Sequence, residues 1–252
     1  MSEKDYTVPA LQKGLQILGM FDSHRRSLTQ IEMADALNVS PSSLYRIVQT
    51  LTGMGYLTKI GTNTYELGSQ VVSRGFSYLA SREIVEISAP FITKLRDKTS
   101  LSSHLAIREE TETLYVFRAL ALQRVSVNVP VGTRFPCHTT AMGRALLIDM
   151  SPAELEILYQ GQRLDGYPEP SPQTLPDLIA LCDRERERGF SVHYSDHSTA
   201  IAVPVRSFTG EVVAAVNVSG PDTIMKKAGI HGQLFKSLEE TASQIMKEIG
   251  GE

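Results

Sequence analysis

The sequence predicts an α+β protein with a mostly helical N-terminal part and a larger C-terminal part that combines strands with helices. At 252 residues the chain is long for one ordinary domain and suits two. Apolar residues repeat at helical spacing near the N-terminus, whereas later runs such as "SHLAIRE" and "EVVAAVNVSG" are typical of strands. Because strands and helices mix without a regular βαβ order, an antiparallel sheet with packed helices is favoured over a doubly wound fold.

Composition excludes several classes of protein. Hydrophobic residues make up 42% and charged residues 21%, which is typical of a globular chain. No apolar run approaches the roughly 18 residues that cross a bilayer. The first residues, "MSEKDYTVPALQK", contain acids and lack the apolar core of a signal peptide, so we expect a cytoplasmic protein. Cys137 and Cys182 form no CxxC pair and are expected to be free thiols.

Two helices and a turn are expected first. The helices span residues 8–21 and about 28–37, because apolar residues recur there at steps of three and four. Asn38 and Val39 then turn the chain. The two apolar stripes consist of Leu11, Leu15, Leu18 and Phe21, and of Leu28, Ile31, Ala34 and Leu37.

A third helix is expected to begin after Ser40, a favourable N-cap residue, with Pro41 at the first helical position. Gly53 and Gly55 end it. The run "YLTKIGTNTYEL" then predicts a β-hairpin. The apolar stripe of this helix consists of Leu44, Ile47, Val48 and Leu51. The order of helix, helix, turn, helix and hairpin is that of a winged helix-turn-helix.

The boundaries of three parts follow from this order. We expect the winged helix-turn-helix to occupy residues 1–67. A linker helix is expected over 68–82, and a second domain over 83–252.

The third helix carries a polar row opposite its apolar stripe. In a helix-turn-helix this face enters the major groove of DNA, where Arg and Gln can contact base edges and Ser and Tyr can bond phosphates. The hairpin would touch the DNA backbone or the minor groove. A solvated helix face is the ordinary alternative. The candidate DNA contacts are Ser40, Ser42, Ser43, Tyr45, Arg46 and Gln49 on the helix, and Lys59 and Asn63 in the hairpin.

Charge limits how such a surface would work. Residues 1–80 hold seven Lys and Arg against six Asp and Glu, and the whole chain has a net charge of −3. DNA binding would therefore depend on a few well placed cations and not on a broad basic surface.

The C-terminal part is expected to alternate between helices and strands. Helices are predicted over "REIVEISAPFITKLRDKT", with an interruption or new start at Pro90, and over "TTAMGRALLIDM". "SPAELEILY" carries a capping box, "LPDLIALCDRERERG" ends at Gly189, and residues 234–249 form the last helix. The predicted strands are "SHLAIRE", "TLYVFRAL", "RVSVNVPV", "FSVHY", "AIAVPV" and "EVVAAVNVSG".

Two segments of this part indicate an anion-binding site. "HTTAMG" leads from an extended segment into a helix, whose free N–H groups near Ala141 and Met142 would favour negative charge. In "AAVNVSG", alternation places Ala215, Asn217 and Ser219 on one face of a strand, where the last two supply neutral donors. Asn217 and Ser219 could equally be hydrogen-bonded interior residues.

A second hypothesis is a metal-binding protein or enzyme whose N-terminal domain is only an interaction module. His193, Asp196 and His197 offer metal ligands, and Cys137 with His138 offers a nucleophile and a base. Their spacing does not direct the first three toward one point, and adjacent residues of an extended chain point to opposite faces. Ordinary histidines are therefore favoured, with no metal, no cofactor and no catalytic residue.

The N-terminal pattern resembles the DNA-binding domain of the IclR family of bacterial transcription regulators. "GLQILGMF", "LTQIEMADALNVSPSSLYRIVQTLTGMGYL" and "YELG" carry that resemblance. "RFPCHTTAMGRALL", "RERGFSVHYSDHSTAIAVPV" and "GEVVAAVNVSGP" resemble later motifs of the family, so the similarity covers nearly the whole chain in order.

The resemblance implies a regulator, not an enzyme. Its winged helix-turn-helix would be joined by a linker helix to a GAF-like effector domain. It also implies a homodimer or homotetramer on a partly palindromic DNA operator, and control of a catabolic operon by a small organic acid, often a carboxylate. Repression or activation, the operator and the target genes stay open.

Family pocket positions imply a set of effector-binding residues. The segment before Ala200 is about three residues shorter than the family pattern, and His193 stands where the family often has an acid. The effector could therefore differ from glyoxylate- or pyruvate-like molecules, and Tyr194 and Met142 could favour a larger or aromatic one. The candidate effector contacts are Thr140, Ala141, Met142, His193, Asp196, Ala200, Asn217 and Ser219.

Overall fold

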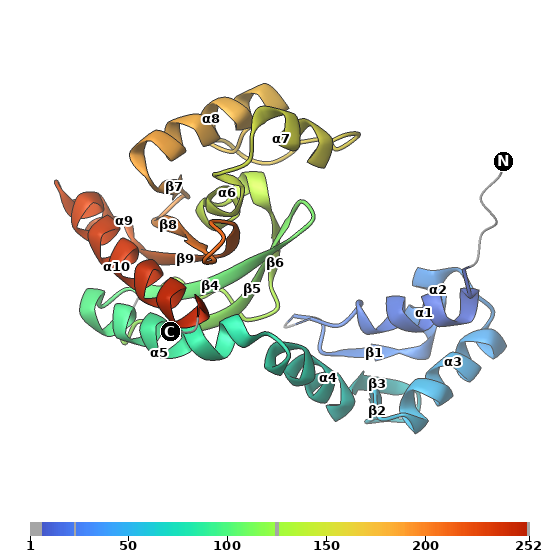
Figure 1. Cartoon of the computed structure of the whole chain (residues 1–252). Coiled ribbons are helices and arrows are strands. Elements are labelled where there is room, and N and C mark those ends of the chain that lie inside the picture. Colours follow the sequence, from blue (N-terminus) through green and yellow to red (C-terminus); the bar gives the residue numbers. More distant parts are fainter. Residues whose placement is uncertain (1–6, 23, 124–125, 251–252) are drawn as a thin grey trace. The chain divides into compact units, whose positions relative to one another are not determined.

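A computed structural model describes residues 7–22, 24–123 and 126–250 of the chain (Figure 1). The chain divides into two compact units, residues 1–81 and 82–252. Within the described ranges, no helix combines the length and the apolar character that crossing a membrane requires.

The N-terminal unit contains four helices and a small antiparallel sheet among its described residues. The sheet has the strand order β1-β3-β2. The elements are α1 (Pro9–Leu18), β1 (Ser27–Thr29), α2 (Gln30–Leu37), α3 (Pro41–Gly53), β2 (Leu57–Lys59), β3 (Thr64–Leu67) and α4 (Ser69–Ala80).

The face of α1 that packs differs from the predicted one. Ile17 is fully buried, whereas Leu11 and Leu15 remain 62% exposed. Gly14 explains the choice, because a Cβ built there would already lie 3.6 Å from Ile47 Cγ2 of α3. The glycine side of α1 therefore approaches α3 most closely. The predicted stripe was wrong at Leu11 and Leu15, whereas Leu18 and Phe21 do pack in the core.

The start of the second helix was also wrong. Leu28 lies in β1, where it pairs with Tyr65 of β3 and is 1% exposed. The helix begins two residues later, at Gln30, because Thr29 closes a capping box. Glu32 N–H donates to Thr29 Oγ1 at 3.3 Å, and Thr29 N–H donates to Glu32 Oε2 at 2.7 Å. Ile31, placed in the predicted stripe, is 71% exposed.

The third helix follows its prediction. Asn38 adopts a left-handed conformation (φ 49°) that turns the chain between α2 and α3. Ser40 then accepts a hydrogen bond from Ser43 N–H, and Pro41 is the first helical residue. The predicted hairpin is present as β2 and β3, which pair antiparallel.

The C-terminal unit is built on a six-stranded antiparallel sheet, which confirms the predicted sheet type. Its strand order is β6-β5-β4-β9-β8-β7. The strands are β4 (Ser102–Glu109), β5 (Glu112–Ala119), β6 (Arg134–Pro136), β7 (Ser191–Tyr194), β8 (Ser198–Arg206) and β9 (Val212–Pro221).

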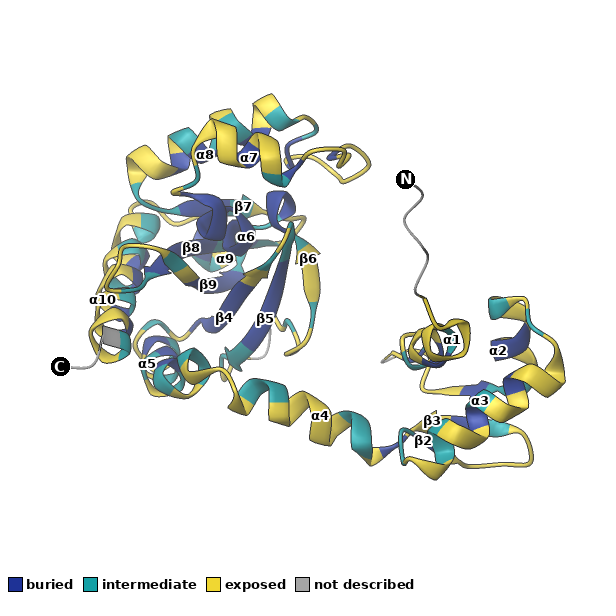
Figure 2. Cartoon of the chain, turned by 45° about the vertical axis from the view of Figure 1, so that its right-hand side comes forward, coloured by how far each residue is buried: buried dark blue, intermediate teal, exposed yellow. Residues whose placement is uncertain are grey.

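Helices cover both faces of this sheet. In Figures 1 and 2, α5 and α10 lie on one face and α6 on the other, with α7 and α8 outside α6. Most of the central strands are buried between these layers (Figure 2). The helices are α5 (Glu83–Thr99), η1 (Cys137–Thr139), α6 (Ala141–Leu147), α7 (Pro152–Leu158), α8 (Leu175–Arg188), α9 (Asp222–Met225) and α10 (Ile230–Gly250).

Two predictions for this unit were wrong. Pro90 does not interrupt α5; the residue four positions earlier, Glu86, is exposed, so water can satisfy the carbonyl that loses its partner. The strand expected over 124–131 is absent from 126–131, and Arg124 and Val125 lie outside the described residues. One edge of the sheet is instead formed by β6, which was not predicted, and neither were η1 and α9.

Candidate functional sites: an exposed helix face and a cavity

All eight candidate DNA contacts are exposed. On α3, Leu44 and Val48 are 1% and 0% exposed, so the apolar stripe faces the core and the polar row faces outward. Tyr45, the largest side chain of the row, is 54% exposed. The structure therefore brings the α3 residues together on one accessible face, as a groove-reading helix requires.

Two cations of this surface, Arg46 and Lys59, are not engaged in ion pairs with described residues. Ser40 differs, because its Oγ caps α3 and lies 3.2 Å from Ser42 Oγ. Arg46 is thus free to meet a phosphate or a base, whereas Ser40 acts first on the start of the helix.

The hairpin is tied to the helix-turn-helix. Gln30 N–H donates to the carbonyl of Asn63 at 3.0 Å, and Gln30 Nε2 donates to Tyr65 Oη at 2.9 Å. The turn that contains Asn63 is thereby held against the first turn of α2.

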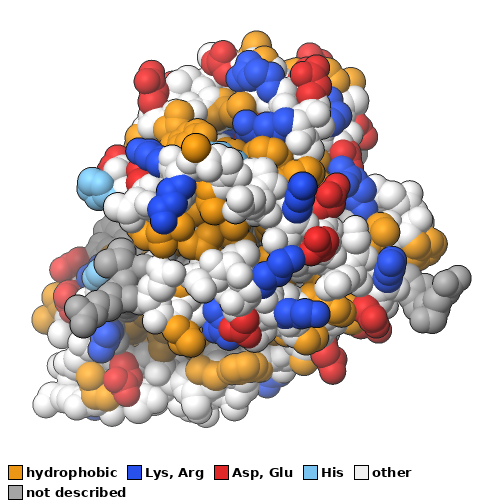
Figure 3. All heavy atoms as spheres, turned by 90° about the vertical axis from the view of Figure 1, so that its left-hand side faces the viewer, with side chains coloured by type: hydrophobic (Ala, Val, Ile, Leu, Met, Phe, Trp, Pro, Cys, Tyr) orange, Lys and Arg blue, Asp and Glu red, His pale blue; other side chains and the backbone are white. Residues whose placement is uncertain are grey.

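Charges of both signs are interspersed on the face of the molecule in Figure 3, where blue Lys and Arg lie among red Asp and Glu. Hydrophobic side chains gather in a hollow between them (Figure 3). This face, on the side of the C-terminal unit, offers no broad basic surface (Figure 3).

A cavity of about 440 Å³ lies in the C-terminal unit, and all eight candidate effector contacts line it. Its walls come from β5 and β6, the segment before β6, the start of α6, the loop at residues 167–171, and the turn between β7 and β8. Most residues of the walls were not among the predicted contacts; they include Tyr115, Val127, Val129, Phe135, Tyr167 and Glu169. Local patterns do not show that these residues meet at one cavity; the tertiary fold brings them together.

The register of the sheet sets the floor of the cavity. Ala200 of β8 lies opposite His193 of β7 and opposite Ser219 of β9. Ala202 lies opposite Asn217 in the next row of that face. Directly opposed residues of antiparallel strands project to the same face, so the short side chain of Ala200 leaves space between His193 and Ser219.

The polar groups at this floor are neutral. Ser219 is 2% exposed, and its Oγ finds no hydrogen-bond partner among the described residues. Burial, reinforced by the positive charge of Arg144, lowers the pKa of His193 to about 4, so its imidazole is uncharged at neutral pH. Of the described residues that line the cavity, none is Lys or Arg.

The first turn of α6 lies at the cavity, and two of its N–H groups are already satisfied within the chain. Thr140 Oγ1 accepts from Gly143 N–H at 3.0 Å, and the Thr140 carbonyl accepts from Arg144 N–H at 3.1 Å. Ala141 and Met142 do line the cavity. Helix α6 has only seven residues, and helix-dipole effects fall off within the first turn.

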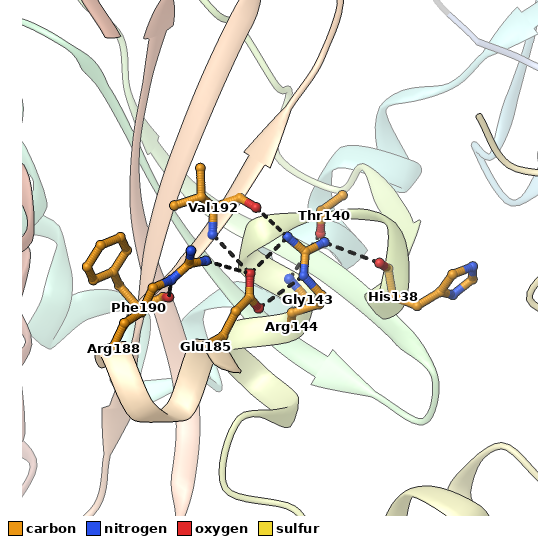
Figure 4. Close-up of polar contacts among 8 residues, drawn as sticks. All are labelled: His138, Thr140, Gly143, Arg144, Glu185, Arg188, Phe190 and Val192. Atoms are coloured by element: carbon orange, nitrogen blue, oxygen red, sulfur yellow. Dashed lines mark hydrogen bonds and ion pairs between the residues drawn. The ribbon is translucent and has the colours of Figure 1, made fainter. Parts of the chain in front are cut away.

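A buried ion pair supports this wall (Figure 4). Arg144 Nε donates to Glu185 Oε2 at 3.0 Å, and Arg144 Nη2 donates to Glu185 Oε1 at 3.2 Å. Arg144 also donates to the carbonyls of His138 (3.2 Å) and Val192 (2.6 Å), and Val192 N–H donates to Glu185 Oε1 at 3.1 Å. The pair therefore connects the residue before His193 to the segment that leads into α6.

The metal and enzyme hypothesis finds no support. In the ranges that the structure describes, no three His, Cys, Asp or Glu side chains are placed to hold a metal ion. Cys137 is fully buried, and burial raises the pKa of its thiol to about 11, so the thiolate needed for nucleophilic attack is scarce at neutral pH.

An exposed polar helix face in one unit and a ligand-sized cavity in the other are the features expected of a ligand-responsive DNA-binding regulator. Family models agree. Residues 10–61 match the IclR helix-turn-helix domain, and residues 76–247 match the bacterial transcriptional regulator IclR C-terminal domain. The chain belongs to the IclR family, whose members are transcriptional regulators and not enzymes.

Individual relatives extend this comparison. The chain is 31% identical to the Pca regulon regulatory protein of Pseudomonas putida over 83% of this chain and 73% of that one. It is similar to the solved structure of a transcriptional regulator from Rhodococcus sp. RHA1, with 28% identity, a TM-score of 0.83 and coverage of 96% and 98%. An IclR homologue from Microbacterium hydrocarbonoxydans, crystallised with 4-hydroxybenzoate, shares the fold at 21% identity, a TM-score of 0.80 and coverage of 95% and 98%.

Proposed function

We propose that this regulator controls a catabolic operon in response to an organic acid, most simply an aromatic carboxylate, bound in the cavity of its C-terminal domain. The observation that carries the proposal is the pairing of buried neutral donors with aromatic walls. Ser219 Oγ is buried at the floor with no partner among the residues that the structure describes, while Tyr115, Phe135 and Tyr167 line the sides. Hydrogen bonds to a carboxylate are charge-assisted and contribute about 1.5–3 kcal/mol each.

The relatives support the same class of ligand. One homologue of this fold holds 4-hydroxybenzoate. A cavity of about 440 Å³ lies within the usual range for small-molecule sites and suits a substituted benzoic acid.

DNA reading is assigned to α3 and the hairpin, in a domain proposed to span residues 1–67. Residues 68–82 would link it to the effector domain at 83–252. Arg46 and Gln49 are suited to base edges, and Lys59 and Asn63 to the DNA backbone or minor groove. A regulator that reads bacterial operators in this way acts in the cytoplasm.

Assembly into homodimers or homotetramers is part of the proposal. Two-fold operators need two copies of the reading helix. Helix α4 offers a surface for contact with a second copy. None of its residues is buried, and its apolar residues Val72 and Phe76 are 59% and 67% exposed.

Two measurements test this function. A thermal-shift screen of the full chain against organic acids should show stabilisation by a benzoic acid, since a ligand at a hundred times its Kd adds about 2.7 kcal/mol. Footprinting on DNA that flanks the regulator's own gene should show a protected site whose occupancy changes with that acid. A protein that no acid stabilises and that protects no DNA would refute the proposal.

A further inference from the structure

One buried histidine lies beside the cavity without lining it. His104 of β4 is 0% exposed and lies directly opposite Asn217 of β9. Its ring meets the ring of Tyr115, a cavity wall, edge-on at a centroid distance of 5.6 Å. The proposed effector site does not use this histidine directly.

The contacts between His104 and Asn217 fix the orientation of the asparagine amide. His104 backbone N–H donates to Asn217 Oδ1 at 3.0 Å. A backbone N–H is always a donor, so the atom that it meets must be the amide oxygen and not the amide nitrogen. The usual ambiguity between the two ends of an asparagine side chain is thereby removed.

The same contacts fix the tautomer of the histidine. His104 Nδ1 also lies 3.0 Å from Asn217 Oδ1. Because that oxygen is an acceptor only, Nδ1 must carry the hydrogen, and Nε2 is left with a lone pair that has no partner among the described residues. Burial, partly offset by the bond to Asn217, lowers the pKa of His104 to about 4, which agrees with a neutral ring.

Both lone pairs of Asn217 Oδ1 are therefore occupied by one residue. Asn217 lines the cavity and is 3% exposed, and its Nδ2 makes no hydrogen bond to any described residue. Asn217 can thus offer a ligand its N–H donors and no acceptor. Ser219 Oγ, two residues along on the same face of β9, is a second polar group there and has no partner among the described residues. Its hydroxyl can donate to a ligand and can also accept, so Asn217 alone is held as a donor only.

We propose that His104 is a positioning residue that holds Asn217 as a dedicated donor and so makes the floor of the cavity selective for a ligand oxygen that only accepts, such as a carboxylate oxygen. This selectivity rests on the proposed effector function. The orientation of the Asn217–His104 pair is independent of that function and can be measured without a ligand.

The first experiment reads the tautomer in the full chain without ligand. Protein labelled with ¹⁵N-histidine should show His104, assigned by its absence from H104N, as the neutral Nδ1–H tautomer from pH 5 to pH 8. In N217A the partner oxygen is gone, and the ring should shift toward the Nε2–H tautomer that free histidine prefers. A wild-type ring that carries its hydrogen on Nε2, or is protonated at pH 6, would overturn the proposal.

The second experiment measures ligand selectivity by calorimetry, with 4-hydroxybenzoate and its neutral carboxamide as probes. Asn and Leu have the same branched skeleton, so H104N and H104L form a matched pair in which only H104N keeps a donor near the position of Nδ1. H104L should bind the carboxylate about tenfold more weakly while H104N stays within about threefold of wild type. H104L should reduce affinity for the carboxamide by a smaller factor. The carboxamide also presents an N–H, which can donate to Asn217 Oδ1 once that oxygen is no longer held by His104.

A double-mutant cycle separates positioning from a general structural effect. If His104 acts through Asn217, H104L should change carboxylate affinity little in an N217A background. An equal loss in both backgrounds would overturn the positioning role. If wild-type protein binds neither probe, the aromatic-acid function fails, and the tautomer measurement still decides whether His104 sets Asn217 as a donor.

Discussion

Arg144 and Glu185 form a bidentate ion pair with side chains that are 2% and 0% exposed. Their remaining hydrogen-bonding capacity is directed at the backbone of the pocket wall, where Val192 contributes both its N–H and its carbonyl. Arg188 adds a second cation 3.0 Å from Glu185. The hydrogen-bonding groups of this buried pair are largely satisfied, so the pair holds the surrounding backbone in place. Removing either partner leaves an uncompensated charge in the interior.

Substitution of Arg144 by Met should destabilise the effector domain by about 3–5 kcal/mol, because Glu185 would keep its charge without its main partner. Urea unfolding of the full chain measures the loss. Arg206→Met is the matched control: Arg206 also forms a bidentate pair, with Asp149, but its side chain is 40% exposed. That control should cost less than about 1 kcal/mol. Equal losses for the two variants would show that burial does not determine the strength of these pairs.

Stability should fall as the solution is acidified below the ordinary histidine pKa. The pKa of His104 drops from 6.5 to about 4 on folding, because burial disfavours the charged ring. Between these two pH values the unfolded chain therefore binds more protons than the folded chain. The contribution of the neutral His104 ring to the free energy of unfolding is fully present above pH 6.5 and is lost as the pH falls toward 4. For one such group the change is about 3 kcal/mol.

Urea unfolding at pH 7.5, 6 and 4.5 checks this slope. H104N lacks the titrating ring, so its stability should depend less on pH over the same range. His193, whose pKa is lowered in the same direction, should still supply part of the slope in that variant. Identical slopes in wild type and H104N would contradict the assignment.

Local patterns were sufficient for most of the fold. The cap at Ser40 and the alternation through Asn217 and Ser219 depend only on neighbouring residues, and the structure keeps them. The packing face of α1 could not be predicted, because the helix is apolar on two sides and a contact between Gly14 and Ile47 decides between them. The strand β1 has three residues, too few for a period of two to be visible.

Long-range register accounts for what the sequence analysis missed in the cavity. The pairing of His104 with Asn217 joins residues 113 positions apart, so no local pattern could reveal it. Val127 and Val129 alternate like strand residues but line the cavity without pairing in the sheet. Such side chains take their role from the space that the tertiary fold leaves beside them.

Filling the cavity should abolish effector binding without unfolding the domain. Ala200 lies at the floor between His193 and Ser219, so Ala200→Leu would place three extra carbon atoms in the ligand space. Affinity for a stabilising acid should fall more than tenfold, while the melting temperature without ligand changes by a few degrees. Ala180→Leu, at an exposed position of α8, is the control and should leave binding unchanged. Retained binding in Ala200→Leu would place the ligand elsewhere.

The polar row of α3 should determine which DNA sequence is bound. Arg46→Ala and Gln49→Ala should each reduce affinity for the operator by about 1–3 kcal/mol and relax preference at the bases that they contact, because each removes a bidentate donor or acceptor set from the groove. Arg46→Lys keeps the positive charge but loses the planar guanidinium that makes bidentate contacts. Compared with Arg46→Ala, it should therefore recover non-specific DNA affinity more than sequence preference. Arg74→Ala removes one exposed charge from α4 and should leave sequence preference intact. Gel-shift titrations against operator and scrambled DNA at two salt concentrations measure these effects. A double variant of Arg46 and Gln49 that still prefers the operator by the wild-type ratio would remove α3 from the role of reading helix.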